Sequence, residues 1–175
     1  MEREPYAVRA AEPKDAAGLA EVQVRAWREA YRNLLPAAAL AALSVPRGTR
    51  NWKTLLRRGT SRTFLARAMG GEVLAFVNLG PYRGRDLEDG RLLELRALYV
   101  RPGHWRAGIG SALVDTALRE GRGRGARRMV LWVLASNEPA KAFYRAMGFR
   151  PDGGTKLDRR LDGLELREER WSLLL

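Results

Sequence analysis

The sequence contains no cysteine and only one histidine, His104, among its 175 residues. The missing cysteines exclude disulfides, thiolate-bound metals and a cysteine nucleophile, and a single histidine cannot form a histidine cluster around a metal. Long apolar runs are also missing, and the first residues, MEREPYAVRA, lack the apolar core of a signal peptide. We therefore expect a cytoplasmic protein with neither a metal nor a membrane partner.

Lysine and the acidic residues are few compared with arginine, and the net charge is +12. Such a charge favours an anionic partner, which is a nucleic acid, an acidic protein or a phosphorylated cofactor. The arginines are scattered along the chain, however, so a solvated basic surface explains most of them equally well. The GRGRG run at 121–125 is too short for a nucleic-acid-binding segment and is typical of a helix end. A basic nucleic-acid-binding module remains an alternative function, although we do not expect a nucleic-acid partner.

The apolar share of 46% can fill the core of one domain, which we expect to span residues 1–175. Periodicity predicts strands at 6–12, 63–68, 72–80, 92–100 and 128–135, helices up to residue 32, near 51–58, at 108–120 and from 137 to 148, and a C-terminal edge strand. The strand–helix–strand–helix order of the second half predicts a parallel crossover within a mixed α/β sheet.

Glycines mark the change from strand to helix in HWRAGIGSAL, residues 104–113. The first amides of a helix lack partners and favour negative charge, while Gly108 and Gly110 would let a diphosphate approach the backbone. The dinucleotide fingerprint fails at Leu113, and no Lys-Ser/Thr pair follows Gly108 as a P-loop requires. This corner therefore predicts a diphosphate site of another kind, with a ligand-free glycine turn as the alternative.

Two segments carry a more specific signal. LYVRPGHWRAGIGSALV (98–114) and NEPAKAFYRAMGF (137–149) resemble the GNAT superfamily of acetyl-CoA-dependent N-acetyltransferases. The first resembles the family's acyl-CoA motif, a strand ending in L-Y-V-x-P followed by Q/R-x-x-G-x-G/A, and the second its Asn…Tyr helix. WREAYRNLLP and GFRPDGG extend the similarity more weakly. The resemblance implies an α/β (α+β) fold with a mixed, mostly antiparallel sheet, one parallel crossover and helices on both faces.

The resemblance also implies acetyl-CoA as the cofactor. The backbone of Leu98, Tyr99 and Val100 would pair with the pantetheine arm like an added strand. The other implied cofactor-binding residues are Trp105, Arg106, Ala107, Gly108, Ile109, Gly110, Ser111, Asn137 and Tyr144. Trp105 departs from the Q/R position of the motif, so Arg106 beside it would supply the polar contact to the diphosphate.

Acetyl transfer needs a base for the amine and an acid for the departing thiolate. By resemblance, Tyr144 is the acid and Glu94, mid-strand in LLELRALYV, is the base. The alternative for Tyr144 is a core tyrosine. The alternatives for Glu94 are an exposed Glu94–Arg96 face or a structural ion pair, with a water chain as the base instead. Without cysteine a thiol acyl-enzyme is excluded, so we expect direct transfer in a ternary complex.

Trp27 and Tyr31 lie on the first predicted helix, which in family members borders the acceptor groove. We therefore expect both to contact substrate, with a place in the core as the alternative for Trp27. The expected acceptor is the primary amine of a small molecule or a protein, and a homodimer is compatible with the family. A non-catalytic acyl-CoA sensor is the second alternative function. Fold alone does not identify the acceptor.

Overall fold

The computed structural model describes residues 5–87, 91–158 and 164–175. The elements in chain order are β1 (Tyr6–Ala10), a short 3-10 turn (Pro13–Asp15), α1 (Ala16–Ala30), α2 (Ala37–Ala41), α3 (Val45–Arg58), β2 (Arg62–Ala68), β3 (Val73–Pro81), β4 (Leu92–Val100), α4 (Ile109–Gly123), β5 (Arg128–Leu134), α5 (Glu138–Ala146), β6 (Arg150–Asp158) and β7 (Leu166–Leu174).

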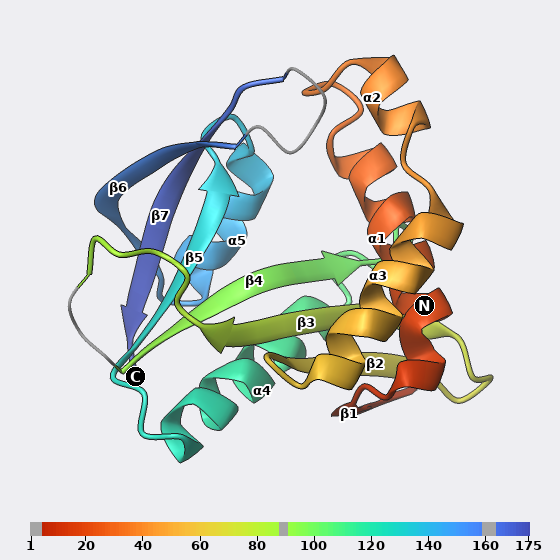
Figure 1. The fold of residues 1–175 in the computed structure, drawn as a ribbon, viewed down its shortest axis with the longest axis horizontal. Coiled ribbons are helices and arrows are strands. Elements are labelled where there is room, and N and C mark those ends of the chain that lie inside the picture. Colours follow the sequence, from red (N-terminus) through yellow and green to blue (C-terminus); the bar gives the residue numbers. More distant parts are fainter. Residues whose placement is uncertain (1–4, 88–90, 159–163) are drawn as a thin grey trace.

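A seven-stranded sheet in the order β1-β2-β3-β4-β5-β7-β6 forms the centre of the molecule (Figure 1). Every neighbouring pair is antiparallel except β4 and β5, which run parallel and are joined through α4. The expected mixed, mostly antiparallel sheet with one parallel crossover is therefore confirmed.

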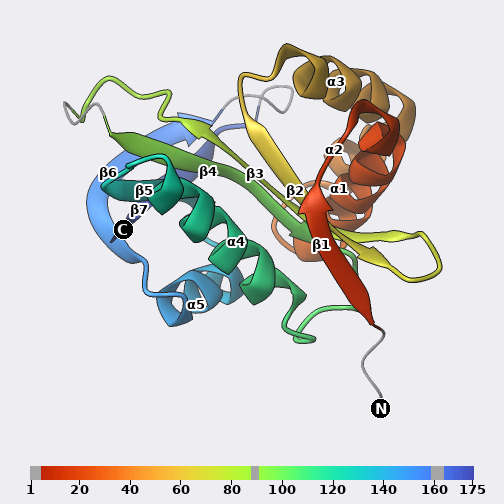
Figure 2. The same ribbon diagram turned by 90° about the horizontal axis from the view of Figure 1, so that it is seen from below.

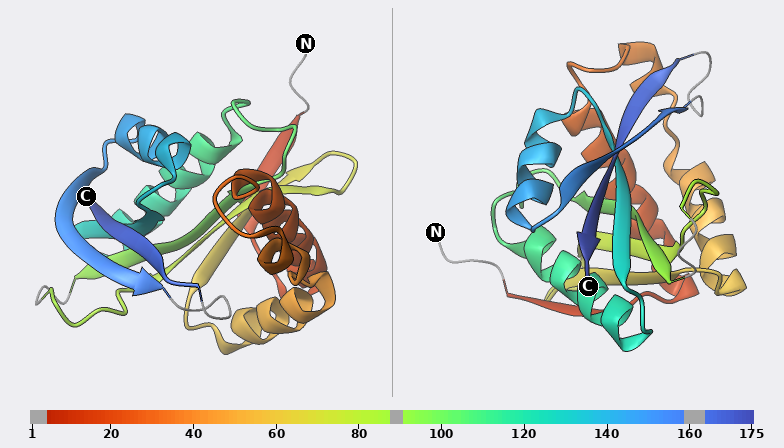
Figure 3. Two further views of the ribbon diagram at one scale, coloured as in Figure 1. Left: turned by 90° about the horizontal axis from the view of Figure 1, so that it is seen from above. Right: turned by 90° about the vertical axis from the view of Figure 1, so that its left-hand side faces the viewer.

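Helices cover both faces of the sheet, as expected (Figures 2 and 3). We call the face under α1 and α3 the α1 face, and the opposite one, under α4 and α5, the α4 face. Because β3 is central and covered on both sides, it is buried from Val73 to Gly80. Phe76 and Trp52 belong to the core on the α1 face, and Trp171 to the core on the α4 face.

The C-terminal strand differs from its prediction. β7 was expected at the sheet edge, but it pairs with β5 on one side and β6 on the other, so the edge prediction is wrong. The glycine-rich start of β6 hid this strand from the sequence pattern, because glycine is depleted in strands. Insertion of β7 between its neighbours buries Trp171, which is 1% exposed.

None of the helices within the described ranges has both the length and the apolar character that crossing a bilayer requires. The segment PYRGRDLEDG, residues 81–90, has the composition of a polar loop, and its residues 88–90 lie outside the described residues.

Candidate active site

The parallel strands β4 and β5 separate halfway along their length. Their pairing runs only from Leu92–Arg128 to Leu95–Leu131. The first four residues of β4 are buried and the last five only partly buried. Figure 1 shows the two strands leaving a common end, near the C-terminus, and diverging. The second half of β4 therefore has β3 on one edge and no strand on the other.

The free edge of β4 carries backbone polar groups. The Arg101 amide donates to the Leu74 carbonyl at 2.8 Å, and successive peptide groups of a strand alternate in direction. The amides and carbonyls of Leu98 and Val100 therefore point toward the free edge. The Trp105 indole N–H donates to the Val100 carbonyl at 2.8 Å, as this direction requires. Tyr99, the third strand residue expected to bind cofactor, points its backbone toward β3.

The loop that follows β4 bends sharply before α4. Gly103, Arg106 and Gly108 have φ angles of 90°, 62° and 83°. Arg106 is the one residue other than glycine with positive φ in the described chain, a conformation rare enough to suggest a functional constraint. Within the described residues the six amides of 106–111 have no hydrogen-bond acceptor. Together with the start of α4, they form a set of free donors suited to an anion.

Gly110 brings this loop into contact with two other parts of the site. A Cβ placed on Gly110 would lie 3.5 Å from Phe143 Cζ and 3.6 Å from Val100 Cγ2. The first turn of α4 therefore packs between the end of β4 and helix α5. The loop, the free strand edge and α5 form one continuous site.

Helix α5 begins at the expected cap. The Asn137 Oδ1 atom accepts a hydrogen bond from the Ala140 amide at 3.1 Å. The Tyr144 ring lies edge-on to Phe143 and Phe149, at centroid distances of 5.3 and 5.9 Å. Burial, with a smaller contribution from Tyr99, raises the pKa of Tyr144 far above its ordinary value. The phenol therefore keeps its proton at neutral pH.

Trp27 and Tyr31 close the site from α1. Their rings are 4.9 Å apart, and Trp27 lies 6.4 Å from Tyr99. Burial raises the pKa of Tyr31, Tyr99 and Tyr144 add to this rise, and Asn137 acts in the opposite direction. The structure therefore brings α1, β4 and α5 together around these side chains. The Trp27 indole N–H is buried and has no hydrogen-bond partner among the described residues.

Glu94 is 2% exposed and lies in the paired half of β4. The Arg83 amide and Nε donate to its Oε2 at 3.2 and 3.0 Å, and Arg83 Nη2 donates to Oε1. Desolvation acts to raise the pKa of Glu94, but the hydrogen bonds and charge of Arg83 outweigh it, and the pKa is lowered. Of the alternatives, an exposed pair with Arg96 is excluded. The catalytic role of Glu94 stays a prediction.

A bulge at Arg96 changes the alternation along β4. Ala97 pairs with Asn78 and Leu95 with Leu79, so Arg96 is the extra residue. Simple alternation would place Leu98 on the face of Glu94. Instead, Leu98 packs into the α4-face core, while Ala97 and Tyr99 pack on the α1 face. The bulge coincides with the point at which β5 leaves β4.

Two residue sets near the site were not found from the sequence. Arg83 lies in a segment that reads as an ordinary polar loop, so nothing marked it as the partner of Glu94. The charged residues Glu168 and Arg170 alternate along β7 and are 8% and 6% exposed. Their alternation in LREERW was the available signal, but without the sheet order it did not indicate which face they occupy.

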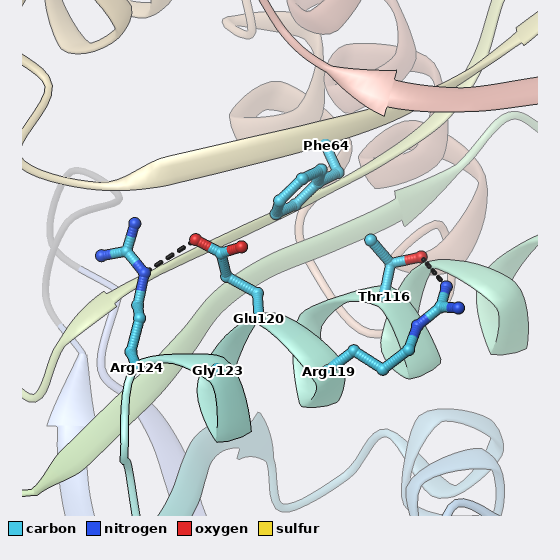
Figure 4. Close-up of a pocket in the computed structure, with 6 residues that line it drawn as sticks. All are labelled: Phe64, Thr116, Arg119, Glu120, Gly123 and Arg124. Carbon is cyan, nitrogen blue, oxygen red and sulfur yellow. Dashed lines mark hydrogen bonds and ion pairs between the residues drawn. The ribbon is translucent and has the colours of Figure 1, made fainter.

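A surface hollow of about 490 Å³ lies away from these site residues, between β2 and the outer side of α4 (Figure 4). Its lining residues are Phe64, Thr116, Arg119, Glu120, Gly123 and Arg124, and Glu120 is already paired with Arg124 at 2.7 Å. None of the residues expected from the sequence lines it.

Comparisons with known proteins agree with this geometry. The model of the acetyltransferase (GNAT) family matches residues 22–149. The uncharacterized N-acetyltransferase YuaI of Bacillus subtilis is 29% identical over 161 residues, 92% of this chain and 88% of the relative. The chain belongs to the GNAT family and is an N-acetyltransferase.

Solved structures show the same fold at low sequence identity. A GCN5-related N-acetyltransferase of Rhodopseudomonas palustris superposes with a TM-score of 0.76 at 20% identity, covering 100% of this chain and 99% of the other. The PaiA N-acetyltransferase of Thermoplasma acidophilum, solved with coenzyme A, has a TM-score of 0.73 at 19% identity and covers 94% of this chain and 98% of the other. The family uses acetyl-CoA as acetyl donor.

Proposed function

We propose that this N-acetyltransferase binds acetyl-CoA with its diphosphate on the free amides of 106–111 and transfers the acetyl group directly to a primary amine. The unpaired amides carry the proposal, because six donors without an acceptor among the described residues, next to the start of a helix, form a site that an anion such as a diphosphate can bind. The guanidinium of Arg106 adds a positive charge. The Trp105 indole N–H already donates to the Val100 carbonyl. Arg106 would therefore make the polar contact to the diphosphate that the motif's Q/R position usually makes.

The free edge of β4 suits the pantetheine arm. Leu98 offers an amide and a carbonyl on this edge, and Val100 offers an amide. An extended chain such as the pantetheine arm can pair with these groups as an added strand would. Tyr99 contributes its ring rather than its backbone. Ala107, Gly108, Ile109, Gly110 and Ser111 complete the proposed cofactor site with Asn137 and Tyr144.

Acetyl-CoA supplies a thioester whose carbonyl carbon the amine attacks. Tyr144 holds a phenolic proton that its raised pKa keeps in place, and we assign it the protonation of the departing thiolate. Glu94 remains ionised because Arg83 lowers its pKa. We assign Glu94 the role of the base that accepts the proton released by the amine. A base of lowered pKa is weak, so water between Glu94 and the amine is part of this proposal.

The acceptor, a small-molecule or protein amine, is proposed to lie against Trp27 and Tyr31 on the α1 face. The unpartnered Trp27 indole N–H supports this position, because a buried donor without an acceptor is unusual in a plain core. The continuous sheet from β1 to β7 supports a single domain that performs the whole reaction.

The proposal is tested by calorimetry with acetyl-CoA and by CoA release with a panel of amines. We expect micromolar binding of acetyl-CoA and CoA release that depends on one class of amine. Tyr144→Phe separates catalysis from a sensor role, because the variant should keep cofactor affinity and lose turnover. Absence of binding would refute the proposal.

A further inference from the structure

Lys156 places its ammonium group in a cage formed by a tryptophan and a buried carboxylate. Its Nζ atom lies 4.2 Å from the centroid of the Trp132 ring and 3.1 Å from Glu168 Oε2. An aromatic face beside a carboxylate is an arrangement that binds alkylammonium groups. The protein's own lysine therefore shows that this cage binds a primary ammonium group.

The cage lies on the α1 face, next to the proposed acceptor position. Glu168 pairs in register with Leu134 of β5 and with Lys156 of β6. Trp171, three residues later, is in the α4-face core, so alternation places Glu168 on the α1 face. The Asn137 amide donates to the Leu134 carbonyl at 2.9 Å, which connects this strand end to the cap of α5.

Tyr31 connects the cage with the expected acid electrostatically, because Tyr144 and Glu168 both act to raise the pKa of its phenol. The cage suits a charged group that accompanies the reacting amine rather than the reacting amine itself.

Glu168 has unused binding capacity. The residue is 8% exposed, and its Oε2 atom makes no hydrogen bond, because the contact with Lys156 is an ion pair without hydrogen-bond geometry. An ionised carboxylate can accept about four hydrogen bonds, and buried ones are normally satisfied. Arg170 beside it is already paired with Asp86 and Asp152, so it leaves Glu168 to other cations.

The Lys156 ammonium group can leave the cage. Its side chain is 37% exposed, whereas that of Glu168 is 11% exposed. A long flexible chain at a partly open position can swing into solvent, and its ammonium group regains hydration there.

We propose that the acceptor is a primary amine carrying a second cationic group, which Glu168 and Trp132 bind in competition with Lys156. This inference rests on the proposed function, since it names the substrate class of the same site. The reacting nitrogen would then lie toward Tyr144, and the second charge on the β5–β7 side.

The test compares 1,5-diaminopentane with 1-aminopentane, which differ only in the second ammonium group. Dissociation constants are measured by calorimetry with the full chain saturated with CoA, and again without CoA. We expect the diamine to bind about tenfold more tightly, as one charge-assisted contact predicts. Glu168→Gln should abolish this preference, and Lys156→Met should increase it by removing the competing ammonium group.

Glu169→Gln is the matched control, because that carboxylate lies one residue away on the opposite face, near Lys141 of α5. It should leave the preference unchanged. Equal affinity for both amines in the wild type and in Lys156→Met would overturn the inference. Failure of CoA to bind would instead refute the proposed function, while the CoA-free titration still decides the diamine preference. Because Glu168→Gln and Lys156→Met shift the preference in opposite directions, general destabilisation cannot imitate the result.

Discussion

Replacing Glu94 with glutamine tests the assignment of this residue as the general base. The substitution keeps the size of the side chain but removes the negative charge that Arg83 holds through three hydrogen bonds. Loss of a general base typically slows catalysis about 10²- to 10⁴-fold. Because the pKa of Glu94 is lowered, it is a weak base, and we expect the low end, about 10²-fold in kcat, with unchanged affinity for acetyl-CoA.

The same substitution also costs stability. Glu94 is almost fully buried, whereas the Arg83 side chain is 53% exposed, so water screens part of the pair. Discounting for this, we expect a loss of about 2 kcal/mol, or about 4–8 °C in the melting temperature of a chain of this size. Thermal unfolding and steady-state kinetics on one preparation separate the two effects.

Arg83→Met supplies the decisive pH experiment. Arg83 lowers the pKa of Glu94, so its removal must raise that pKa. If Glu94 takes the amine proton, the acidic limb of the kcat/KM profile should then move to higher pH. An unmoved limb, together with a melting loss and nearly normal turnover in Glu94→Gln, would refute the base assignment and leave Glu94 as an anchor for the loop after β3.

Three further substitutions address the rest of the site. Tyr144→Phe should lower kcat about 10²- to 10³-fold and leave the dissociation constant of CoA unchanged, which single-turnover kinetics and calorimetry can measure. Gly110→Val should weaken acetyl-CoA binding at least about tenfold, because its methyl groups would extend beyond a Cβ already in contact with Phe143 and Val100. Gly123→Ala, in open space at the far end of the same helix, is its control, and equal losses would argue against a local effect. Trp105→Phe removes one hydrogen bond to the Val100 carbonyl and should weaken cofactor binding about fivefold by calorimetry, whereas unchanged affinity would exclude the indole from loop positioning.

Local chemistry explains which parts of the structure were predictable. The glycine turn before α4 and the start of α5 at Asn137 depend on neighbours within a few residues, and the sequence indicated both. The ion pair between Arg83 and Glu94 joins a loop to a strand, and no periodicity reveals it. The bulge at Arg96 likewise depends on pairing with β3, so the exact faces of Glu94 and Leu98 required the fold.

The order of β6 and β7 in the sheet could not be predicted from the sequence for a related reason. Whether β7 lies at an edge is decided by where β6 pairs, and a hairpin can add to a sheet in either order. The position of Glu168 beside Trp132 and Lys156 follows from that order alone. The sequence therefore indicated the residues proposed to bind the acetyl donor more completely than those proposed to bind the acceptor.

We propose above that the free backbone amides between residues 106 and 111 bind the diphosphate of coenzyme A. Amide-resolved NMR during a titration with CoA measures this directly. We expect the signals of these residues to move together with a micromolar dissociation constant and their hydrogen exchange to slow. Saturable CoA binding that leaves those signals in place, or no binding at all, would contradict it.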